Sequence, residues 1–507
     1  MALVDLLEPL FSHWRTILIA SAIFLVYFYW IVPYRTMRAI YPKGPIPLPF
    51  ISHLWDTVRH KGLMHLQMDE YCKKYGQVFS MLTIGSKPCI IISDPEMLRD
   101  IFVKEFSSFA DRPVFFKLPE PLSSMLTLAT KDKWKRIRNT LTPAFSGLKM
   151  KQIVPLMNIC CDNLIEKLGE FADKGESIDI KKIHQCLTMD AIVSAAFGFQ
   201  VNSQNNPDDP VLKAAKQAMN QSTSQKILLT LLSTIPFGAK IMEKTPSLWM
   251  SNNVPLLNIT EEIVQTKRES SESSSSRKDM LDLMLAASDD PSVPEKKKLS
   301  DMEVIAQSLV FLAAGYETTS TTLSFVSHHL AVNPEVQDKL QQEIDSVWPD
   351  ENQMLSYETV HEMPYLDMVL AEALRMYPPG FFIVRVCTEA CVLKGVKIPE
   401  GLIVIIPVYS IHRDPSIYPD PDEFNPERFS PAAKQSLNPY SYMPFGHGPH
   451  NCIGMRFAQM EMKMVLARML KKYRLEVAAD TKIPPDVAIA STLSCSGVNV
   501  KISSRKT

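Results

Sequence analysis

The chain has 507 residues, of which 46% are hydrophobic and 21% charged, and its formal net charge is −1. These proportions are typical of a folded globular protein and exclude an intrinsically disordered chain. The near-neutral balance also excludes a protein that binds nucleic acid through its overall charge, so we expect no nucleic-acid partner.

The first predicted element is an apolar helix at residues 16–34, a segment without charged residues. Its length at helical rise is sufficient to cross a hydrocarbon core. Basic residues follow the segment, and this asymmetry predicts that the C-terminal body lies in the cytoplasm. A cleaved signal peptide fits poorly, because the apolar run is long and no small-residue cleavage site follows it. The sequence therefore predicts a transmembrane anchor.

Residues 42–49 contain four prolines, which disfavour both a helix and a central strand and predict a semi-rigid spacer. The expected organisation is a lumenal N-terminus (1–15), the anchor (16–34), a basic and proline-rich linker (35–50) and one large catalytic domain (51–507). We find no internal repeat in this sequence.

The large domain is predicted to be mainly helical with a minor β-sheet. Two apolar runs separated by a turn indicate a hairpin within residues 78–93. The pattern is mainly helical over 95–268, and a serine-rich exposed loop follows at 269–278. A capping box begins a long helix at 300–332, and short strands return at 392–408.

The most specific motif is FGHGPHNCIG at residues 445–454. Glycines and a proline bend the chain before Cys452, and an apolar helix is predicted after it. A cysteine at a helix N-terminus is expected to have a lowered thiol pKa and to favour the thiolate. The nine cysteines contain no C-x-x-C pair, so we interpret the other eight as mostly buried free thiols in a reducing compartment.

Three other interpretations of the motif compete with this one. In the first interpretation, Cys452 is an inert buried cysteine. In the second, His447, His450 and Cys452 bind zinc, although the spacing is not a standard zinc pattern and no fourth ligand is evident. The third is a dinucleotide-binding loop, but Asn451 stands where its third glycine is required.

The same stretch resembles the haem-binding loop of the cytochromes P-450, F-x-x-G-x-R-x-C-x-G. This resemblance implies haem b with Cys452 as the axial iron ligand and Phe445 among the cofactor-binding residues. His450 stands where the family usually has an arginine paired with a haem propionate. Since the charge of histidine depends on pH, we expect haem retention to be weaker or more pH-sensitive than in relatives.

The long helix contains AGYETTS at residues 314–320, and glycine and threonine are poor helix formers at its middle. Side-chain hydroxyls that bond to backbone carbonyls are expected to bend the helix there. An ordinary packing stretch with an exposed glutamate is an equally good interpretation of these residues alone. The stretch resembles the family signature A-G-x-[DE]-T-T, which implies that Thr318 holds a water molecule and that Glu317 supplies protons.

Further charged residues extend the resemblance. Glu372 and Arg375 lie three apart on one helical face, usually a surface pair. With Arg428 they resemble the family's Glu-Arg-Arg triad, which implies a structural lock on the cysteine loop.

Trp134 and Arg138 resemble the family's W-x-x-x-R, and Arg112 and Arg385 resemble two more propionate-facing arginines. A solvated basic face is a reasonable alternative for Arg112. Six basic residues are expected near the cysteine side: Lys133, Lys135, Arg136, Lys463, Lys471 and Lys472. They form either a docking patch for an acidic electron donor or an ordinary set of solvated basic side chains.

The resemblance covers essentially the full chain and is closest to the microsomal steroid- and drug-oxidising enzymes of family three, subfamily A, and to thromboxane synthase. It implies a triangular, mainly helical prism with a small sheet. The implied enzyme is a haem-thiolate monooxygenase that inserts one atom of dioxygen into a lipophilic steroid-, drug- or xenobiotic-like substrate. It would receive NADPH electrons through NADPH-cytochrome P-450 reductase, with cytochrome b5 as a second candidate partner, and lie in the endoplasmic reticulum membrane.

Two alternatives stay open: a haem-thiolate isomerase of the thromboxane synthase type, and a non-catalytic membrane haem protein. The candidate pocket residues are Phe311, Ala314, Phe382 and Ile383. Their apolar character predicts a large, lipophilic pocket, but not which substrate fills it.

Overall fold

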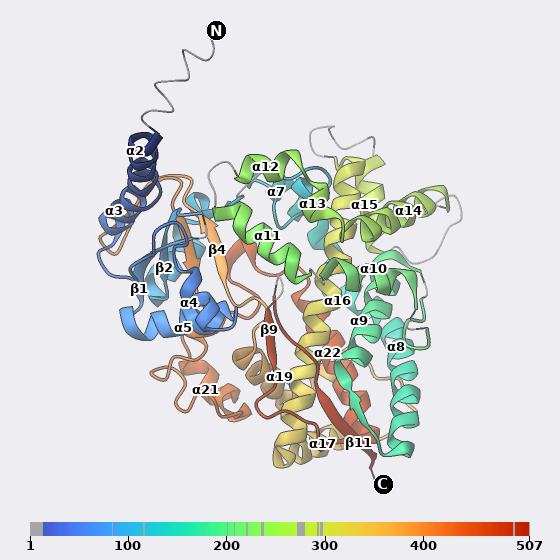
Figure 1. The fold of residues 1–507 in the computed structure, drawn as a ribbon. Helices are drawn as coiled ribbons and strands as arrows, with labels where there is room; N and C mark the ends of the chain where they lie inside the picture. Colours follow the sequence, from blue (N-terminus) through green and yellow to red (C-terminus); the bar gives the residue numbers. More distant parts are fainter. Residues whose placement is uncertain are drawn as a thin grey trace.

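The computed structural model describes residues 14–505 except 84, 115–116, 200, 207, 220–221, 235–237, 271–278, 290, 292–293, 295–297 and 490–491. Most of the predicted serine-rich loop at 269–278 therefore lies outside the described residues. Figure 1 shows helices filling most of the body, with the small sheet that contains β1, β2 and β4 beside the N-terminal helix. The mainly helical fold with a minor sheet is confirmed.

The N-terminal helix is longer than the sequence predicted. It comprises α2 (Trp14–Val26), a π-helical segment η1 (Tyr27–Ile31) and α3 (Val32–Ile40). These 27 residues have a mean hydropathy of 2.0 in their most apolar stretch and are long and apolar enough to cross a membrane. The extended linker begins only at Tyr41, because the basic residues predicted to open it belong to α3.

The linker folds back onto the helix that precedes it. Arg38 Nη1 donates to the Pro42 carbonyl at 2.8 Å, and Trp30 Nε1 donates to the Pro47 carbonyl at 2.8 Å. Met37 of α3 is fully buried, and Ser80 N of β1 donates to the Lys43 carbonyl at 2.9 Å. These contacts fasten the end of the anchor to the body.

The main sheet has the strand order β1-β2-β7-β4. The predicted hairpin is confirmed, since β1 (Val78–Leu82) pairs antiparallel with β2 (Pro88–Ile92). β7 (Ile403–Ile406) then pairs parallel with β2 and antiparallel with β4 (Ile383–Val386). Smaller sheets join β3 (Ser177–Asp179), β11 (Asn499–Ser504) and β8 (Tyr473–Glu476); β5 (Cys391–Leu393) and β6 (Val396–Ile398); and β9 (Val487–Ile489) and β10 (Leu493–Cys495).

Helices cover and fill the rest of the body. In chain order they are α4 (Leu54–Arg59), α5 (Met64–Tyr75), α6 (Pro95–Arg99), α7 (Lys131–Leu141), α8 (Gly147–Lys174), α9 (Ile180–Phe197), α10 (Pro210–Met219), α11 (Thr223–Thr234), α12 (Gly238–Lys244), α13 (Ser247–Met250), α14 (Val254–Ser270), α15 (Met280–Asp289), α16 (Asp301–Val332), α17 (Pro334–Val347), α18 (Tyr357–His361), α19 (Pro364–Met376), α20 (Val408–Ile411), α21 (Pro431–Ser436) and α22 (Met455–Lys472). Short 3-10 and π turns connect several of these helices.

The predicted long helix is α16, which runs through the middle of the body (Figure 1). Its capping box is confirmed: Ser300 Oγ accepts from Glu303 N, and Glu303 returns a bond to Ser300 N. α16 is α-helical throughout residues 314–320, and the expected bonds are present, since the Thr318 and Ser320 hydroxyls donate to the Ala314 and Tyr316 carbonyls. Gly315 permits close packing against α9, since a Cβ there would lie 2.9 Å from the Ile192 side chain.

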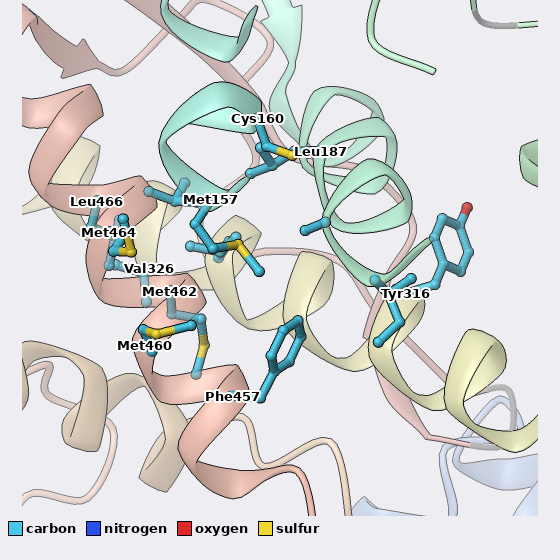
Figure 2. Close-up of a cluster of buried hydrophobic side chains, with 14 of the residues drawn as sticks. Met157, Cys160, Leu187, Tyr316, Val326, Phe457, Met460, Met462, Met464 and Leu466 are labelled. Atoms are coloured by element: carbon cyan, nitrogen blue, oxygen red, sulfur yellow. The ribbon is translucent and has the colours of Figure 1, made fainter. Parts of the chain in front are cut away.

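Behind the cysteine loop lies a methionine-rich core. Figure 2 shows side chains of α22 meeting those of α8, α9 and α16, among them Met157, Tyr316, Met460, Met462 and Met464. Flexible thioethers fill irregular gaps between crossing helices. This packing holds α22, and with it the loop that precedes this helix.

Candidate active site

The loop before α22 is shaped by glycines that no other residue replaces without strain. Gly446 and Gly448 have φ values of 72° and 71°, in the left-handed region. A Cβ on Gly448 would also collide with the Phe102 carbonyl. The turn closes where Cys452 N donates to the Phe445 carbonyl at 2.8 Å, and α22 starts after Gly454.

Cys452 lies deep in the fold, yet its side chain is open to an internal cavity. The space between the cavity walls is about 860 Å³, including its mouth. Its lining comes mainly from α16, the cysteine loop, α7, α22 and the loop before α7: Arg112, Leu126, Thr127, Trp134, Arg138, Phe145, Ile192, Val310, Phe311, Ala314, Gly315, Thr318, Thr319, His450, Asn451, Cys452, Ile453, Gly454, Phe457 and Ala458.

The predicted lowering of the Cys452 pKa is wrong for the protein alone. Burial raises the pKa of this thiol, and the Gly454 N–H and the charge of Arg138 oppose the shift only in part. A directly bonded metal ion deprotonates a thiol outright. The helix terminus alone therefore does not outweigh the effect of burial on this thiol.

Three arginines lie close together beside the cavity: Arg112 and Arg138 line it, whereas Arg385 is outside the lining but near Arg112 and His450. Arg112 Nη1 donates to the Thr127 carbonyl at 3.0 Å, and Arg385 Nη1 donates to the Val384 carbonyl at 2.9 Å. Arg138 donates to the carbonyl of Asn451 at 2.9 Å and to its side-chain oxygen at 2.8 Å. These partners are all neutral, and within the described part of the chain no carboxylate forms an ion pair with any of the three arginines.

The arginines make one another's charge unfavourable. Burial, and then the charge of Arg112, lower the pKa of Arg385 to about 9. Burial, and then the charge of Arg138, lower the pKa of Arg112. Buried cations without counter-ions are costly, so this cluster fits an anionic ligand that enters the cavity.

His450 completes the cationic edge but does not carry charge. Its ring stacks on Trp134 with centroids 3.7 Å apart and an interplanar angle of 24°. Burial, and then the charges of Arg385, Arg112 and Arg138, lower the pKa of His450 to about 2. Its ring nitrogens are buried, and a contact with the Ala110 backbone offsets this lowering of the pKa only in part. Beside these three cations the imidazole favours its neutral form, which offers one N–H donor, and the pH-sensitive haem retention expected from the sequence stays a prediction.

The two predicted catalytic residues of α16 face different directions, because consecutive residues of an α-helix point about 100° apart. Thr318 lines the cavity, and its hydroxyl donates to the Ala314 carbonyl at 2.7 Å. Glu317 lies outside the cavity lining and is buried against α9 and β10. Its carboxylate accepts from Lys181 Nζ at 3.1 Å and from Ser494 Oγ at 2.7 Å. The helix thus separates the alcohol from the acid.

The three residues of the predicted clamp are close together. Arg375 donates to Glu372 through Nε at 2.7 Å and Nη2 at 2.8 Å, and both side chains are fully buried. Arg428 Nε lies 3.4 Å from Glu372 Oε1. Arg375 Nη1 also donates to the His412 carbonyl, and the His412 ring accepts from Met443 N. This chain of contacts reaches the segment just before the cysteine loop.

The predicted pocket residues divide into two pairs. Phe311 and Ala314 line the cavity, whereas Phe382 and Ile383 pack beside the main sheet outside its lining. Sequence reasoning missed Phe457 and Ile192. Phe457 follows Cys452 closely enough for its sequence position to have indicated it, but the place of Ile192 depends on how α9 packs against α16.

The predicted docking patch is not a set of free cations. Lys463 is buried and lies 2.6 Å from Asp367, and Lys471 lies 3.0 Å from Asp345. Arg136, Lys133 and Lys472 also form ion pairs with acidic residues. Five of the six proposed cations therefore already have carboxylate partners.

The residues around the cavity fit haem. A thiol opens into the cavity, arginines without carboxylate partners and a buried imidazole lie at one edge, and the remaining wall is largely apolar. A flat metal complex with carboxylate substituents meets each of these features. The cysteine suits the iron, the cationic edge suits the propionates, and the apolar wall suits the ring.

Comparison with known proteins gives a family for this arrangement. The model of the cytochrome P-450 family matches residues 42–494. The chain is 36% identical to cytochrome P-450 3A30 of Fundulus heteroclitus, over 95% of both chains. It is 36% identical to cytochrome P-450 3A6 of Oryctolagus cuniculus over 94% of both chains, and 38% identical to cytochrome P-450 3A11 of Mus musculus over 92% of both.

Proposed function

The chain belongs to the cytochrome P-450 family and is a haem-thiolate monooxygenase, and we propose that Cys452 is its axial iron ligand. The observation that supports this assignment is a single cavity that contains both the Cys452 thiol and the cationic edge. Within the part of the chain that the structure describes, Cys452 is the only cysteine in this cavity lining. The other eight cysteines lie elsewhere in the fold.

We propose that the cationic edge holds the haem propionates. Arg112, Arg138 and Arg385 offer charged donors, and neutral His450 adds one N–H. Trp134 keeps the His450 ring in place by stacking. When bound, the haem iron activates dioxygen with electrons that originate from NADPH.

The residues of α16 are proposed to control water and protons. Thr318 Oγ1 already uses its proton in a bond to Ala314, so its lone pairs are free to accept a bond from a water molecule in the cavity. The Glu317 carboxylate lies outside the cavity lining and is paired with Lys181. Proton supply from Glu317 therefore requires its side chain to leave that ion pair, or a chain of water molecules to pass around α16.

The substrate is proposed to be a lipophilic steroid-, drug- or xenobiotic-like molecule. Leu126, Phe145, Ile192, Val310 and Phe311 form an apolar wall that excludes water and offers few hydrogen bonds. The similarity to cytochromes P-450 of subfamily 3A supports a substrate of this class.

The membrane location and the partners follow from the same proposal. The apolar helix at Trp14–Ile40 anchors the protein in the endoplasmic reticulum membrane, with the catalytic domain in the cytoplasm. NADPH-cytochrome P-450 reductase is the proposed electron donor, and cytochrome b5 a second one.

Isotopic labelling tests this function. The full-length protein, reductase and NADPH are incubated under labelled dioxygen with a panel of lipophilic compounds. A product that contains one labelled oxygen atom and forms only with NADPH supports monooxygenation.

The position of Glu317 away from the cavity favours one alternative, a peroxide-rearranging isomerase that needs no proton supply. That enzyme would convert a lipid peroxide without NADPH and without taking up the label.

A further inference from the structure

One face of α16 leads from the surface to the cavity. Glu303, Gln307 and Phe311 are spaced four residues apart, so their side chains lie along one side of the helix. Glu303 forms a two-bond ion pair with Arg136 of α7, at 2.5 and 2.9 Å. Phe311 lines the cavity. Gln307 lies between them and is fully buried.

The amide of Gln307 is bonded to the loop before α7. Its Nε2 donates to the Ser124 carbonyl at 2.8 Å, and its Oε1 accepts from Leu126 N at 2.8 Å. Nε2 also donates to the Glu303 carbonyl at 3.1 Å. Both ends of the side chain are thus satisfied, and two of the three bonds hold the same short stretch of loop.

This stretch forms part of the cavity wall. Leu126 and Thr127 line the cavity, and the Thr127 carbonyl accepts from Arg112 at 3.0 Å. Leu126 is consequently fixed from two sides, by Gln307 on its own amide and by Arg112 one residue later. The proposed propionate-binding edge and α16 are therefore connected through the loop that supplies Leu126.

We propose that Gln307 is a positioning residue that determines ligand selectivity, by setting how far the Leu126 wall stands from α16. It does not touch the ligand and is absent from the cavity lining. Its effect passes through the Ser124 carbonyl and the Leu126 amide. The selectivity role rests on the proposed function, because ligand binding is detected through the absorbance of the haem. The contact between Gln307 and the loop is tested separately, by a measurement that does not use haem absorbance.

Another buried glutamine provides a matched control. Gln337 of α17 is also fully buried. Its Nε2 donates to the Leu330 carbonyl at 3.0 Å and the Leu475 carbonyl at 2.9 Å, and its Oε1 accepts from Leu475 N at 2.8 Å. This bonding pattern is nearly the same, but it holds β8, outside the cavity lining. Gln307→Met and Gln337→Met therefore remove equivalent bonds at different places.

The first measurement is hydrogen exchange of the segment 122–128 in the full-length protein. Gln307→Met should speed exchange of this segment about tenfold, because the Leu126 amide loses its acceptor. Gln337→Met should leave it at the wild-type rate. Equal exchange in all three proteins would overturn the proposed contact.

The second measurement is the affinity of imidazole and of 1-alkylimidazoles with increasing chain length, read from the Soret shift. For each protein, the affinity of the longest 1-alkylimidazole is divided by the affinity of imidazole. This ratio should be about tenfold higher in Gln307→Met than in wild type, because the Leu126 wall no longer limits the length of the alkyl chain. Gln337→Met should reproduce the wild-type series. If the series of Gln307→Met coincides with wild type, or Gln337→Met changes it equally, the selectivity role is wrong. Absence of any Soret band would instead refute the proposed function.

Discussion

Among single residues, we expect substitution of a buried charge in the clamp of Glu372, Arg375 and Arg428 to lower the free energy of unfolding the most. Glu372→Gln leaves Arg375 fully buried without its counter-ion, which should cost about 3–5 kcal/mol of unfolding free energy. Urea denaturation at matched haem content measures this loss. Glu427→Gln removes the partner of Lys339 from a pair that is about half exposed, and should cost under about 1 kcal/mol. Equal losses in the two variants would contradict the structural role of the clamp.

For single residues of the site, the local sequence predicts identity better than charge or orientation. Cys452 and Arg138 were identified from neighbours within a few residues, and both line one cavity. The direction of Glu317 and the raised pKa of Cys452 were not predicted. Both depend on burial by segments distant in sequence, such as Lys181 on α9 and the walls around the thiol. A motif names the residue type, but tertiary packing sets its charge and orientation.

At the scale of elements, the contact of α16 with α9 gives a test of packing. Gly315→Ala gains about 1 kcal/mol of helix propensity, but places a methyl group 2.9 Å from the Ile192 side chain. Overpacking of this kind costs about 1–3 kcal/mol, so we expect a net loss of stability. Ile192→Ala should relieve the collision. In a double-mutant cycle, the combined variant should lose less than the sum of the single variants, and simple additivity would refute the proposed contact.

The elements themselves differed in how well they were predicted. The hairpin β1–β2 and the start of α16 were predicted from turn and cap residues, which act within a few positions. The N-terminal helix continues beyond residue 34, where the predicted anchor ends, and α3 contacts the body. Met37 is buried there, and Arg38 bonds to the linker carbonyls. Such contacts have no signature in the local sequence.

For the whole molecule, buried neutral histidines predict sensitivity to acid. Burial lowers the pKa of His184 to about 3 and the pKa of His412 to about 3, and both side chains are fully buried. Between pH 6.5 and 3 the unfolded chain binds these protons and the folded chain does not. Stability should therefore fall as the pH is lowered through this window, by about 1.4 kcal/mol per pH unit for each histidine.

Urea midpoints measured between pH 6.5 and 5 check this expectation. His184→Leu removes one of the histidine titrations and should reduce the slope of stability against pH by the contribution of one proton. A variant whose stability changes with pH as steeply as wild type would show that His184 does not carry the effect. This comparison concerns slopes, so a constant loss of stability from the substitution does not affect it.

The central claim, that the sulfur of Cys452 binds the haem iron, is tested most directly by the spectrum of the reduced carbon monoxide complex. The wild-type protein should show the long-wavelength Soret band of thiolate-ligated haem. Cys452→Ala should lose this band, because no other cysteine lines the cavity within the described residues. A long-wavelength band that persists in Cys452→Ala, or a wild-type band typical of histidine-ligated haem, would contradict the account.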